Sequence, residues 1–130
     1  MKKLAKELPL DILIAEDNIV NQKLMLDVLD LLGYKCDAAA DGFEVLNAVK
    51  EKKYDLILMD IQMPEMSGEE AARKVRAAAA GNPPKIIAVT AYAMAEDRRK
   101  YLEAGMNGYL SKPFKIDELI AEIKRVMKKG

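Results

Sequence analysis

The chain has 130 residues, in which 21 Lys and Arg side chains balance 21 Asp and Glu side chains, so the formal net charge is zero. Without excess charge there is no electrostatic drive toward nucleic acid or an anionic membrane surface, and neither partner is expected. The length suits one domain, and a composition of 51% hydrophobic and 32% charged residues predicts a soluble globule instead of a disordered chain.

Short apolar runs alternate along the chain with longer amphipathic segments. Continuous apolar runs about as long as one strand are typical of parallel sheets buried on both faces, and hydrophobic residues spaced three and four apart predict helices with one buried side. In chain order the predicted elements are strand Ile12–Ala15, helix Ile19–Leu32, strand Tyr34–Ala39, helix Phe43–Lys52, strand Leu56–Met59, helix Glu69–Ala80, strand Ile86–Val89, helix Glu96–Ala104, strand Gly108–Ser111 and helix Ile116–Met127.

Five strands that alternate with five helices predict an α/β fold, a doubly wound parallel sheet with right-handed crossovers and helices on both faces. Residues 1–10 precede the first strand and mix Lys2, Lys3 and Lys6 with isolated leucines. Such a segment has neither the apolar core of a signal peptide nor the ~20 apolar residues of a membrane span. Export and membrane insertion are therefore not expected.

Polar side chains follow four of the predicted strands. Glu16 and Asp17 follow the first strand, Asp60 the third, Thr90 the fourth and Lys112 the fifth. One Asp after a strand is most often a loop residue or a helix cap, but coincidence at four strand ends is much less expected. Ligands of doubly wound sheets bind outside the carboxyl ends of the strands. These side chains are therefore predicted to form one site.

The carboxylates of this site point to a hard metal ion. Three carboxylates crowded together repel one another unless a cation lies among them. The chain has no His, and its single Cys36 has no second thiol or imidazole with which to hold zinc or an iron–sulfur cluster. Oxygen ligands alone select a hard cation, so Glu16, Asp17 and Asp60 predict a Mg²⁺ site, with Mn²⁺ as a plausible substitute. One unpaired cysteine also fits a reducing, cytoplasmic compartment.

A cation, a lysine and a hydroxyl together suit a phosphoryl group. The cation and Lys112 would neutralise the phosphoryl oxygens, and Thr90 would donate a hydrogen bond to them. Asp60 ends the most apolar of the predicted strands, which makes it the best candidate for a carboxylate nucleophile that forms an acyl phosphate. Glu16 and Asp17 would then hold the metal.

The segments that carry these residues are AEDNIVNQ (15–22), DLILMDIQMPEMSG (55–68), AVTAYA (88–93) and GYLSKPF (108–114). In this order and at these separations they resemble the signature blocks of the receiver domain of two-component response regulators. Each block alone is a weak signal, whereas the four together are highly specific. The resemblance covers about Leu10 to Met127 and is greatest to receivers of hybrid sensor histidine kinases. Residues 1–130 are accordingly predicted to form a single receiver domain with its core at about 10–127.

The resemblance implies a flavodoxin-like fold with strand order 2-1-3-4-5. It also implies that the backbone carbonyl of Gln62 completes the metal shell and that the peptide bond between Lys112 and Pro113 is cis. By matching position, the implied roles are Asp60 as phosphoacceptor, Glu16 and Asp17 as the acidic pair, Thr90 as the switch hydroxyl, Tyr109 as the switch aromatic and Lys112 as the phosphate-binding lysine.

A receiver of this kind takes a phosphoryl group from the phosphohistidine of a sensor histidine kinase or a histidine phosphotransfer protein, and later loses it to water or to another histidine. It catalyses its own phosphorylation and dephosphorylation but turns over no small-molecule substrate. Phosphorylated Asp60 would attract Thr90, and Tyr109 would rotate into the vacated space. A downstream protein could then read the surface of the fourth helix (about Glu96 to Ala104), the fifth strand and the fifth helix. Tyr92 should flank the phosphoryl group and slow its hydrolysis.

Other functions use parts of the same pattern. A Mg²⁺-dependent phosphohydrolase of the haloacid-dehalogenase type needs a general acid two residues after its nucleophile, where this chain has Gln62. A flavin carrier would need a phosphate-binding loop where this chain has Glu16 and Asp17. A receiver that serves only as an interaction module would normally lack a site residue. A free-standing regulator and an excised receiver of a hybrid kinase are both compatible with the sequence.

Overall fold

The computed structural model describes residues 3–79, 81–91 and 94–128. Five strands form one parallel sheet in the order β2-β1-β3-β4-β5, which confirms the flavodoxin-like, doubly wound fold. The elements in chain order are α1 (Lys3–Glu7), β1 (Ile12–Ala15), α2 (Ile19–Leu31), β2 (Asp37–Ala39), α3 (Gly42–Glu51), β3 (Leu56–Asp60), α4 (Gly68–Ala78), β4 (Lys85–Thr90), α5 (Ala95–Glu103), β5 (Gly108–Ser111) and α6 (Ile116–Met127).

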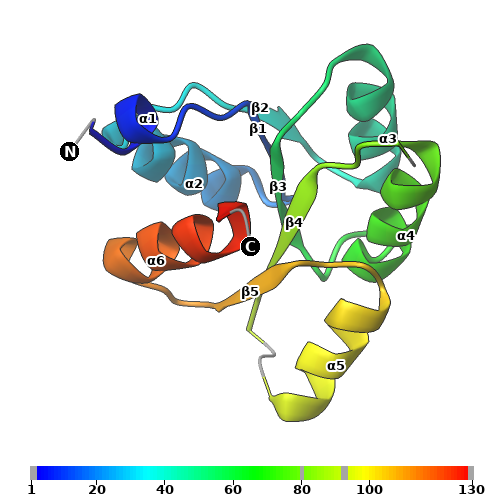
Figure 1. Ribbon diagram of the computed structural model, residues 1–130. Helices are drawn as coiled ribbons and strands as arrows, with labels where there is room; N and C mark the ends of the chain where they lie inside the picture. The colour runs from blue at the N-terminus through cyan, green and yellow to red at the C-terminus, as the bar shows by residue number, and fades with distance from the viewer. Residues whose placement is uncertain (1–2, 80, 92–93, 129–130) are drawn as a thin grey trace.

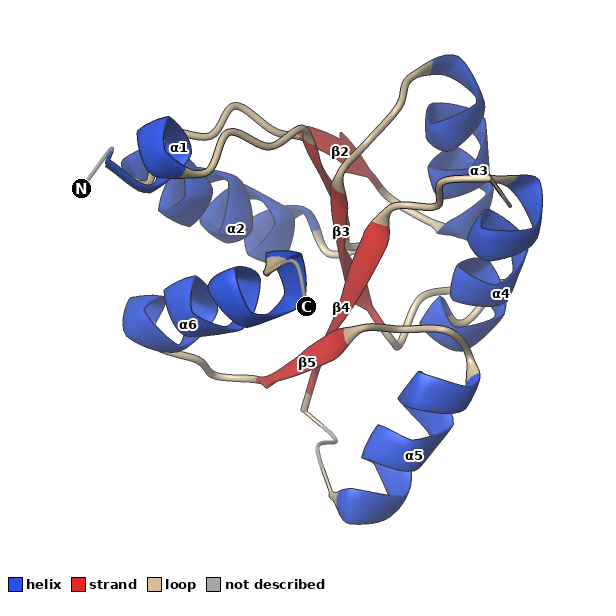
Figure 2. Cartoon of the chain, in the orientation of Figure 1, coloured by secondary structure: helices blue, strands red, loops and turns tan. Residues whose placement is uncertain are grey.

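Helices cover both faces of the sheet, with α1, α2 and α6 on one side and α3, α4 and α5 on the other (Figures 1 and 2). Successive strand residues point to opposite faces, so Ile57 packs in the core beneath α3 and α4 while Leu58 packs beneath α2 and α6. All of β3 is buried, and it pairs with β1 and β4. Asp60, the last residue of β3, therefore stands on the most constrained strand of the sheet.

The prediction of five helices is wrong, because the described residues contain a sixth, the short α1. Leu4 of α1 is buried, and the Ala5 N–H donates to the carbonyl of Leu32 at 3.1 Å. The hydroxyl of Tyr34 donates to the carbonyl of Leu8 at 2.6 Å. The Tyr34 N–H donates to the carbonyl of Leu29 at 3.0 Å, so Tyr34 belongs to the end of α2, and the second strand begins at Asp37 and is shorter than predicted.

Side chains and glycines mark the helix ends as the sequence indicates. Asp41 and Ser67 each accept a hydrogen bond from the backbone N–H three residues later, which satisfies an otherwise unpaired donor of the first turn. Gly33 and Gly105 follow α2 and α5 with φ of 95° and 93°, a conformation that a side chain disfavours. The predicted helix end at Ala80 lies outside the described residues.

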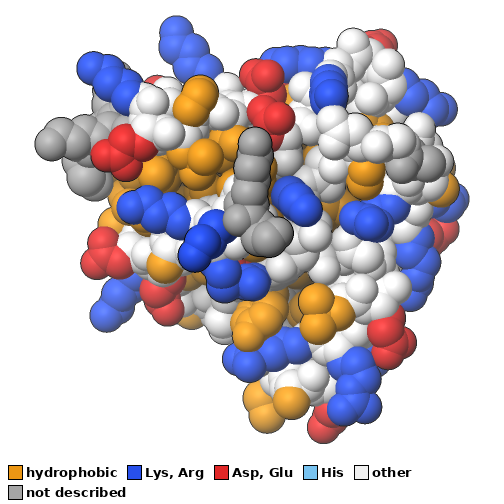
Figure 3. All heavy atoms as spheres, viewed as in Figure 1, with side chains coloured by type: hydrophobic (Ala, Val, Ile, Leu, Met, Phe, Trp, Pro, Cys, Tyr) orange, Lys and Arg blue, Asp and Glu red, His pale blue; other side chains and the backbone are white. Residues whose placement is uncertain are grey.

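Lys and Arg side chains are scattered over the face shown in Figure 3, among acidic and hydrophobic ones. Within the described ranges, no helix has both the length and the hydrophobicity that crossing a membrane requires.

Candidate functional site

Parallel pairing brings the carboxyl ends of four strands to one edge of the sheet. Ala15 of β1 lies opposite Met59 of β3, so Glu16 reaches the level of Asp60. Thr90 ends β4, the other neighbour of β3. Lys112 follows β5 and donates its backbone N–H to the Thr90 carbonyl at 2.7 Å. The peptide bond from Lys112 to the next residue is cis, as the resemblance implies.

Three acidic side chains and one lysine meet at this edge. Glu16, Asp17 and Asp60 each place a carboxylate oxygen within 4.8 Å of the others. Glu16 and Asp60 are only 3% and 7% exposed, whereas Asp17 faces solvent. The ammonium of Lys112 lies 3.0 Å from Oε1 of Glu16 and 3.7 Å from Oδ1 of Asp60. One positive charge therefore faces three carboxylates, and the cluster is short of positive charge.

The pKa values of the two buried carboxyls move in opposite directions. Burial raises the pKa of Asp60 to about 6, the nearby Glu16 adds to the rise, and the Gln62 N–H and Lys112 oppose it. Burial also favours a higher pKa for Glu16, but hydrogen bonds from the Asn18 N–H and Lys112 outweigh it and the pKa is lowered. A cation at this edge would favour ionised Asp60, the form that can act as a nucleophile.

Backbone donors orient both buried carboxylates. The Asn18 N–H donates to Oε2 of Glu16 at 3.0 Å, and the Gln62 N–H donates to Oδ1 of Asp60 at 3.1 Å. The side-chain amide of Gln22 donates to the backbone carbonyl of Glu16 at 3.1 Å. Sequence reasoning assigned no role to Asn18 or Gln22, although both lie in the first quoted segment. Asn18 also caps α2, so helix and carboxylate are fixed by the same residue.

The predicted switch residues lie on the other side of the site. Thr90 is buried, and its Oγ1 accepts a hydrogen bond from the Tyr101 hydroxyl at 3.4 Å. Tyr109 is half-buried, and the guanidinium carbon of Arg98 lies 4.5 Å from its ring centroid. The Tyr109 N–H donates to the Glu122 carboxylate at 2.9 Å. Both α5 and α6 therefore contact the predicted switch residues. Tyr92, the residue expected to flank the phosphoryl group, lies outside the described residues.

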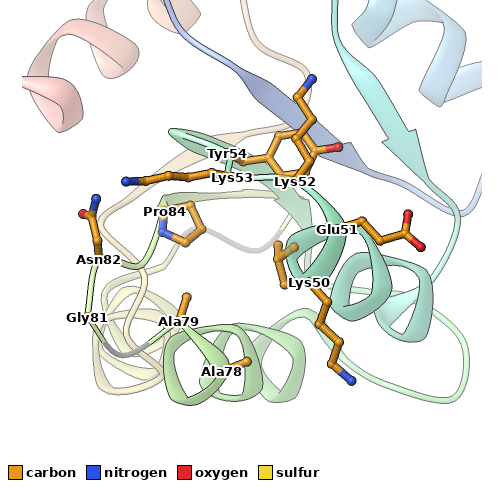
Figure 4. Close-up of a pocket in the computed structure, with 11 residues that line it drawn as sticks. Lys50, Glu51, Lys52, Lys53, Tyr54, Ala78, Ala79, Gly81, Asn82 and Pro84 are labelled. Carbon is orange, nitrogen blue, oxygen red and sulfur yellow. The ribbon is translucent and has the colours of Figure 1, made fainter.

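Two hollows differ in their relation to this chemistry. One, of about 470 Å³, lies beside the carboxylates and is lined by Glu16 and Lys112 together with Leu24, Pro113 and Phe114. The other, of about 380 Å³, opens at the amino ends of β3 and β4, where its lining includes Tyr54 and Asn82 (Figure 4). Ligands of parallel sheets bind at the carboxyl ends of strands, so the first of these two hollows, and not the second, lies at the site. A further hollow of about 590 Å³ also lies at this edge and is lined by Gln62 and Tyr101.

Comparison with known proteins agrees with this geometry. A sequence model of the family described as "Response regulator receiver domain" matches residues 12–124. Histidine protein kinase 1 of Candida albicans is 44% identical over 126 residues, which are 89% of this chain and 5% of the kinase. The chain thus spans a small fraction of the length of this kinase.

Two solved structures share the fold. The receiver domain of a sensor histidine kinase from Pseudomonas aeruginosa, with a magnesium ion coordinated in the active site cleft, is 43% identical with a TM-score of 0.81, covering 89% of this chain and 95% of that one. A chain from the co-crystal structure of the Saccharomyces cerevisiae histidine phosphotransfer protein Ypd1 with the receiver domain of its response regulator Ssk1 is 34% identical with a TM-score of 0.79, covering 89% and 85%.

Proposed function

The chain belongs to the receiver domain family of response regulators and has the phosphoacceptor function of that family, and we propose that Asp60 is the residue that takes the phosphoryl group. The observation that carries this proposal is the buried carboxylate of Asp60 at the end of the central strand, within 4.8 Å of Glu16 and Asp17 and 3.7 Å from Lys112. A phosphohydrolase of the haloacid-dehalogenase type is not favoured, because Gln62 offers no acid at the required position.

The proposed reaction is displacement at phosphorus. A carboxylate oxygen of Asp60 forms a bond to phosphorus, and the bond between phosphorus and the histidine nitrogen of the donor breaks with its electron pair going to that nitrogen. Lys112 can move from Glu16 to the phosphoryl oxygens, where its charge stabilises the transition state. Thr90 can donate a hydrogen bond from its hydroxyl to the same oxygens. In the loss step, the oxygen of water or the nitrogen of another histidine bonds to phosphorus, the bond from Asp60 to phosphorus breaks with its electron pair returning to the carboxylate, and the attacking group releases its proton to solvent.

Mg²⁺ fits the acidic cluster, because every ligand that the cluster offers is an oxygen atom. Among the ion pairs of the described residues, Lys112 alone offsets the charge of the three carboxylates, so a metal ion would supply the missing positive charge. Glu16, Asp17 and Asp60 would hold the ion, and the carbonyl of Gln62 is included in the proposal on the family resemblance. When bound, Mg²⁺ neutralises phosphoryl oxygens and the carboxylates that face them. Mn²⁺, which prefers the same ligands, should substitute.

The donor in this proposal is a phosphohistidine of a sensor histidine kinase or a histidine phosphotransfer protein. The first turns of α2 stand beside the site and expose Ile19, Val20 and Leu24 by 78%, 64% and 57%. Leu24 also lines the hollow next to Glu16 with Pro113. An exposed apolar surface next to an acceptor is suited to docking a protein donor, since it adds binding area that a small donor does not need. The yeast co-crystal of a receiver with a phosphotransfer protein supports this class of partner.

Leu24→Asp tests the docking surface. Transfer from a phosphohistidine protein should slow by about tenfold or more, because a charge then has to be desolvated in the interface, whereas phosphorylation by acetyl phosphate should be unchanged. Leu102→Asp is the matched control, since Leu102 is 61% exposed near the end of α5 and away from this edge of the sheet. Equal slowing with both donors would assign Leu24 to the fold of the site instead of to docking.

The proposed output is a change of surface. Phosphorylated Asp60 would attract Thr90, Tyr109 would turn into the vacated space, and a downstream protein would distinguish the two states of the α5–β5–α6 face.

The proposed location is the cytoplasm, which is supported by the unpaired Cys36, because a free thiol suits a reducing compartment. Residues at about 10–127 are proposed as the receiver core, and the proposal holds equally for a separate regulator or a receiver within a longer kinase.

The acceptor is tested by incubating the protein with acetyl phosphate and Mg²⁺ and locating the modified residue by mass spectrometry. The modification should fall on Asp60 and disappear in Asp60→Asn, which keeps the side-chain shape but removes the nucleophilic charge. Chelation of Mg²⁺ should prevent labelling of the unaltered chain. Undiminished, hydroxylamine-sensitive labelling of Asp60→Asn would refute the assignment.

A further inference from the structure

The hydroxyl of Tyr101 touches the proposed switch hydroxyl directly. Tyr101 lies on α5, is 3% exposed, and donates to Oγ1 of Thr90, which is itself 2% exposed. The distance of 3.4 Å is close to the limit for a hydrogen bond between two oxygens, so it cannot lengthen further and survive. Any movement of the Thr90 hydroxyl away from α5 therefore breaks this contact.

The rest of α5 holds Tyr101 in place and contacts the second switch residue. The carbonyl of Tyr101 accepts the N–H of Met106 at 3.0 Å, and its ring packs in the core cluster formed with α4 and β4. Arg98, one helical turn earlier, lies over the ring of Tyr109 at 4.5 Å. One helix thus contacts both Thr90 and Tyr109 in this state of the protein.

We propose that Tyr101 is a positioning residue that holds Thr90 away from the acceptor in the unphosphorylated protein and so raises the threshold for switching. This inference rests on the proposed roles of Asp60 and Thr90. When Thr90 moves to a phosphoryl group, the phenol of Tyr101 loses one hydrogen-bond partner while it is buried, and a buried donor that loses a partner destabilises the state in which this happens. The contact therefore favours the inactive conformation by the free energy of this hydrogen bond.

Tyr101→Phe removes the hydroxyl and keeps the ring. In the presence of Mg²⁺ it should bind beryllofluoride, a phosphoryl mimic, roughly 2- to 5-fold more tightly than the unaltered chain, because a weak hydrogen bond no longer opposes the movement of Thr90. Tyr34→Phe is the matched control: Tyr34 is equally buried at 3% and donates to a backbone carbonyl on the opposite face of the sheet. The control should lose stability without any change in beryllofluoride affinity.

A double-mutant cycle shows whether the effect passes through Thr90. In a Thr90→Ala background, Tyr101→Phe should leave beryllofluoride affinity unchanged, because there is no hydroxyl left to hold. Unchanged or weaker binding by Tyr101→Phe alone, or equal tightening in the Thr90→Ala background, would overturn the restraint. Failure of the unaltered chain to bind beryllofluoride with Mg²⁺ would instead refute the proposed function, so the two failures are distinguishable.

Discussion

Gly68, the first residue of α4, should be indispensable for the position of Asp60. A Cβ atom at Gly68 would lie 2.5 Å from the backbone oxygen of Asp60 and 2.9 Å from Cα of Ile61. Its N–H donates to the carbonyl of Ile61 at 3.0 Å, so helix and strand end are already in direct contact. Both atoms in the way belong to the backbone and cannot be moved by rotating a side chain. Gly68→Ala must therefore displace either α4 or the acceptor strand end.

The size of the effect follows from these distances. Restoring an ordinary separation of about 3.5 Å requires a backbone movement of about 1 Å. Overpacking of this kind destabilises a core by about 1–3 kcal/mol, and the gain in helix propensity from Gly to Ala offsets at most about 1 kcal/mol. A misplacement of about 1 Å can slow a reaction by about 100-fold. We expect Gly68→Ala to lose about 1–2 kcal/mol of stability and to be phosphorylated about 10- to 100-fold more slowly by acetyl phosphate.

Two other glycines provide controls in the same assays, urea unfolding and the rate of phosphorylation with Mg²⁺. At Gly42 an added Cβ meets the sulfur, Cβ and Cγ of Met66 at 2.6, 2.9 and 2.9 Å, so this buried side chain has to shift, but the three nearest atoms all belong to its side chain and none to the backbone of Asp60. At Gly81 an added Cβ meets nothing within 4 Å. Gly81→Ala should stay within about 1 kcal/mol of the unaltered chain and keep its phosphorylation rate. Gly42→Ala should lose about 1–3 kcal/mol by overpacking Met66 but keep the phosphorylation rate, because this clash does not involve Asp60. A Gly68→Ala protein that matches Gly81→Ala in both measurements would show that this close approach does not position Asp60.

Three further predictions concern the metal, pH and the switch. Saturating Mg²⁺ should raise the melting temperature by binding to the folded state, and Asp17→Asn should remove most of this increase. A thermal unfolding curve that millimolar Mg²⁺ does not shift would count against the metal site. For Glu122, burial favours a higher pKa, but hydrogen bonds from Arg125 and the Tyr109 N–H outweigh it, so the pKa is lowered in the folded protein. The ionised Glu122 therefore contributes its full free energy to the folded state above about pH 4.5, and this contribution is lost as the pH falls through the lower pKa of the folded state. Glu122→Gln should lower the free energy of unfolding by about 1 kcal/mol at neutral pH and reduce its dependence on pH below about pH 4.5, as measured by urea unfolding. An unchanged dependence on pH in this range would contradict the role of Glu122. Thr90→Ala and Tyr109→Ala should still accept beryllofluoride at Asp60 but reduce the resulting amide shift changes over α5, β5 and α6, and undiminished changes in both would exclude the pair as carriers of the signal.

The convergence of the acidic cluster and Lys112 could be predicted from the sequence for a simple physical reason. Once three apolar runs are assigned to one parallel sheet, the backbone ladder determines that their carboxyl ends lie at the same edge, whatever the helices do. Glu16 and Asp60 follow directly from this alignment. By contrast, α1 is only five residues long, too short to show a helical period, and the contact of its Leu4 carbonyl with the Tyr34 hydroxyl depends on a fold that is already complete.

Contacts between a helix and a strand end escaped prediction because they depend on how each helix is rotated and tilted, which no period in the sequence specifies. In α5 the large apolar side chains Tyr101 and Leu102 are adjacent, so periodicity does not decide which of them faces inward, and it does not indicate that the Tyr101 hydroxyl contacts Thr90. Periodicity likewise does not indicate that the carboxylate of Glu122 on α6 accepts a hydrogen bond from the N–H of Tyr109 on β5. The acceptor chemistry therefore resides in backbone alignment that sequence reasoning can reach. If Tyr101 restrains Thr90 as proposed, the barrier to switching resides in these lateral contacts, and receivers with the same signature segments can differ in how readily they change state when their residues at these helix positions differ.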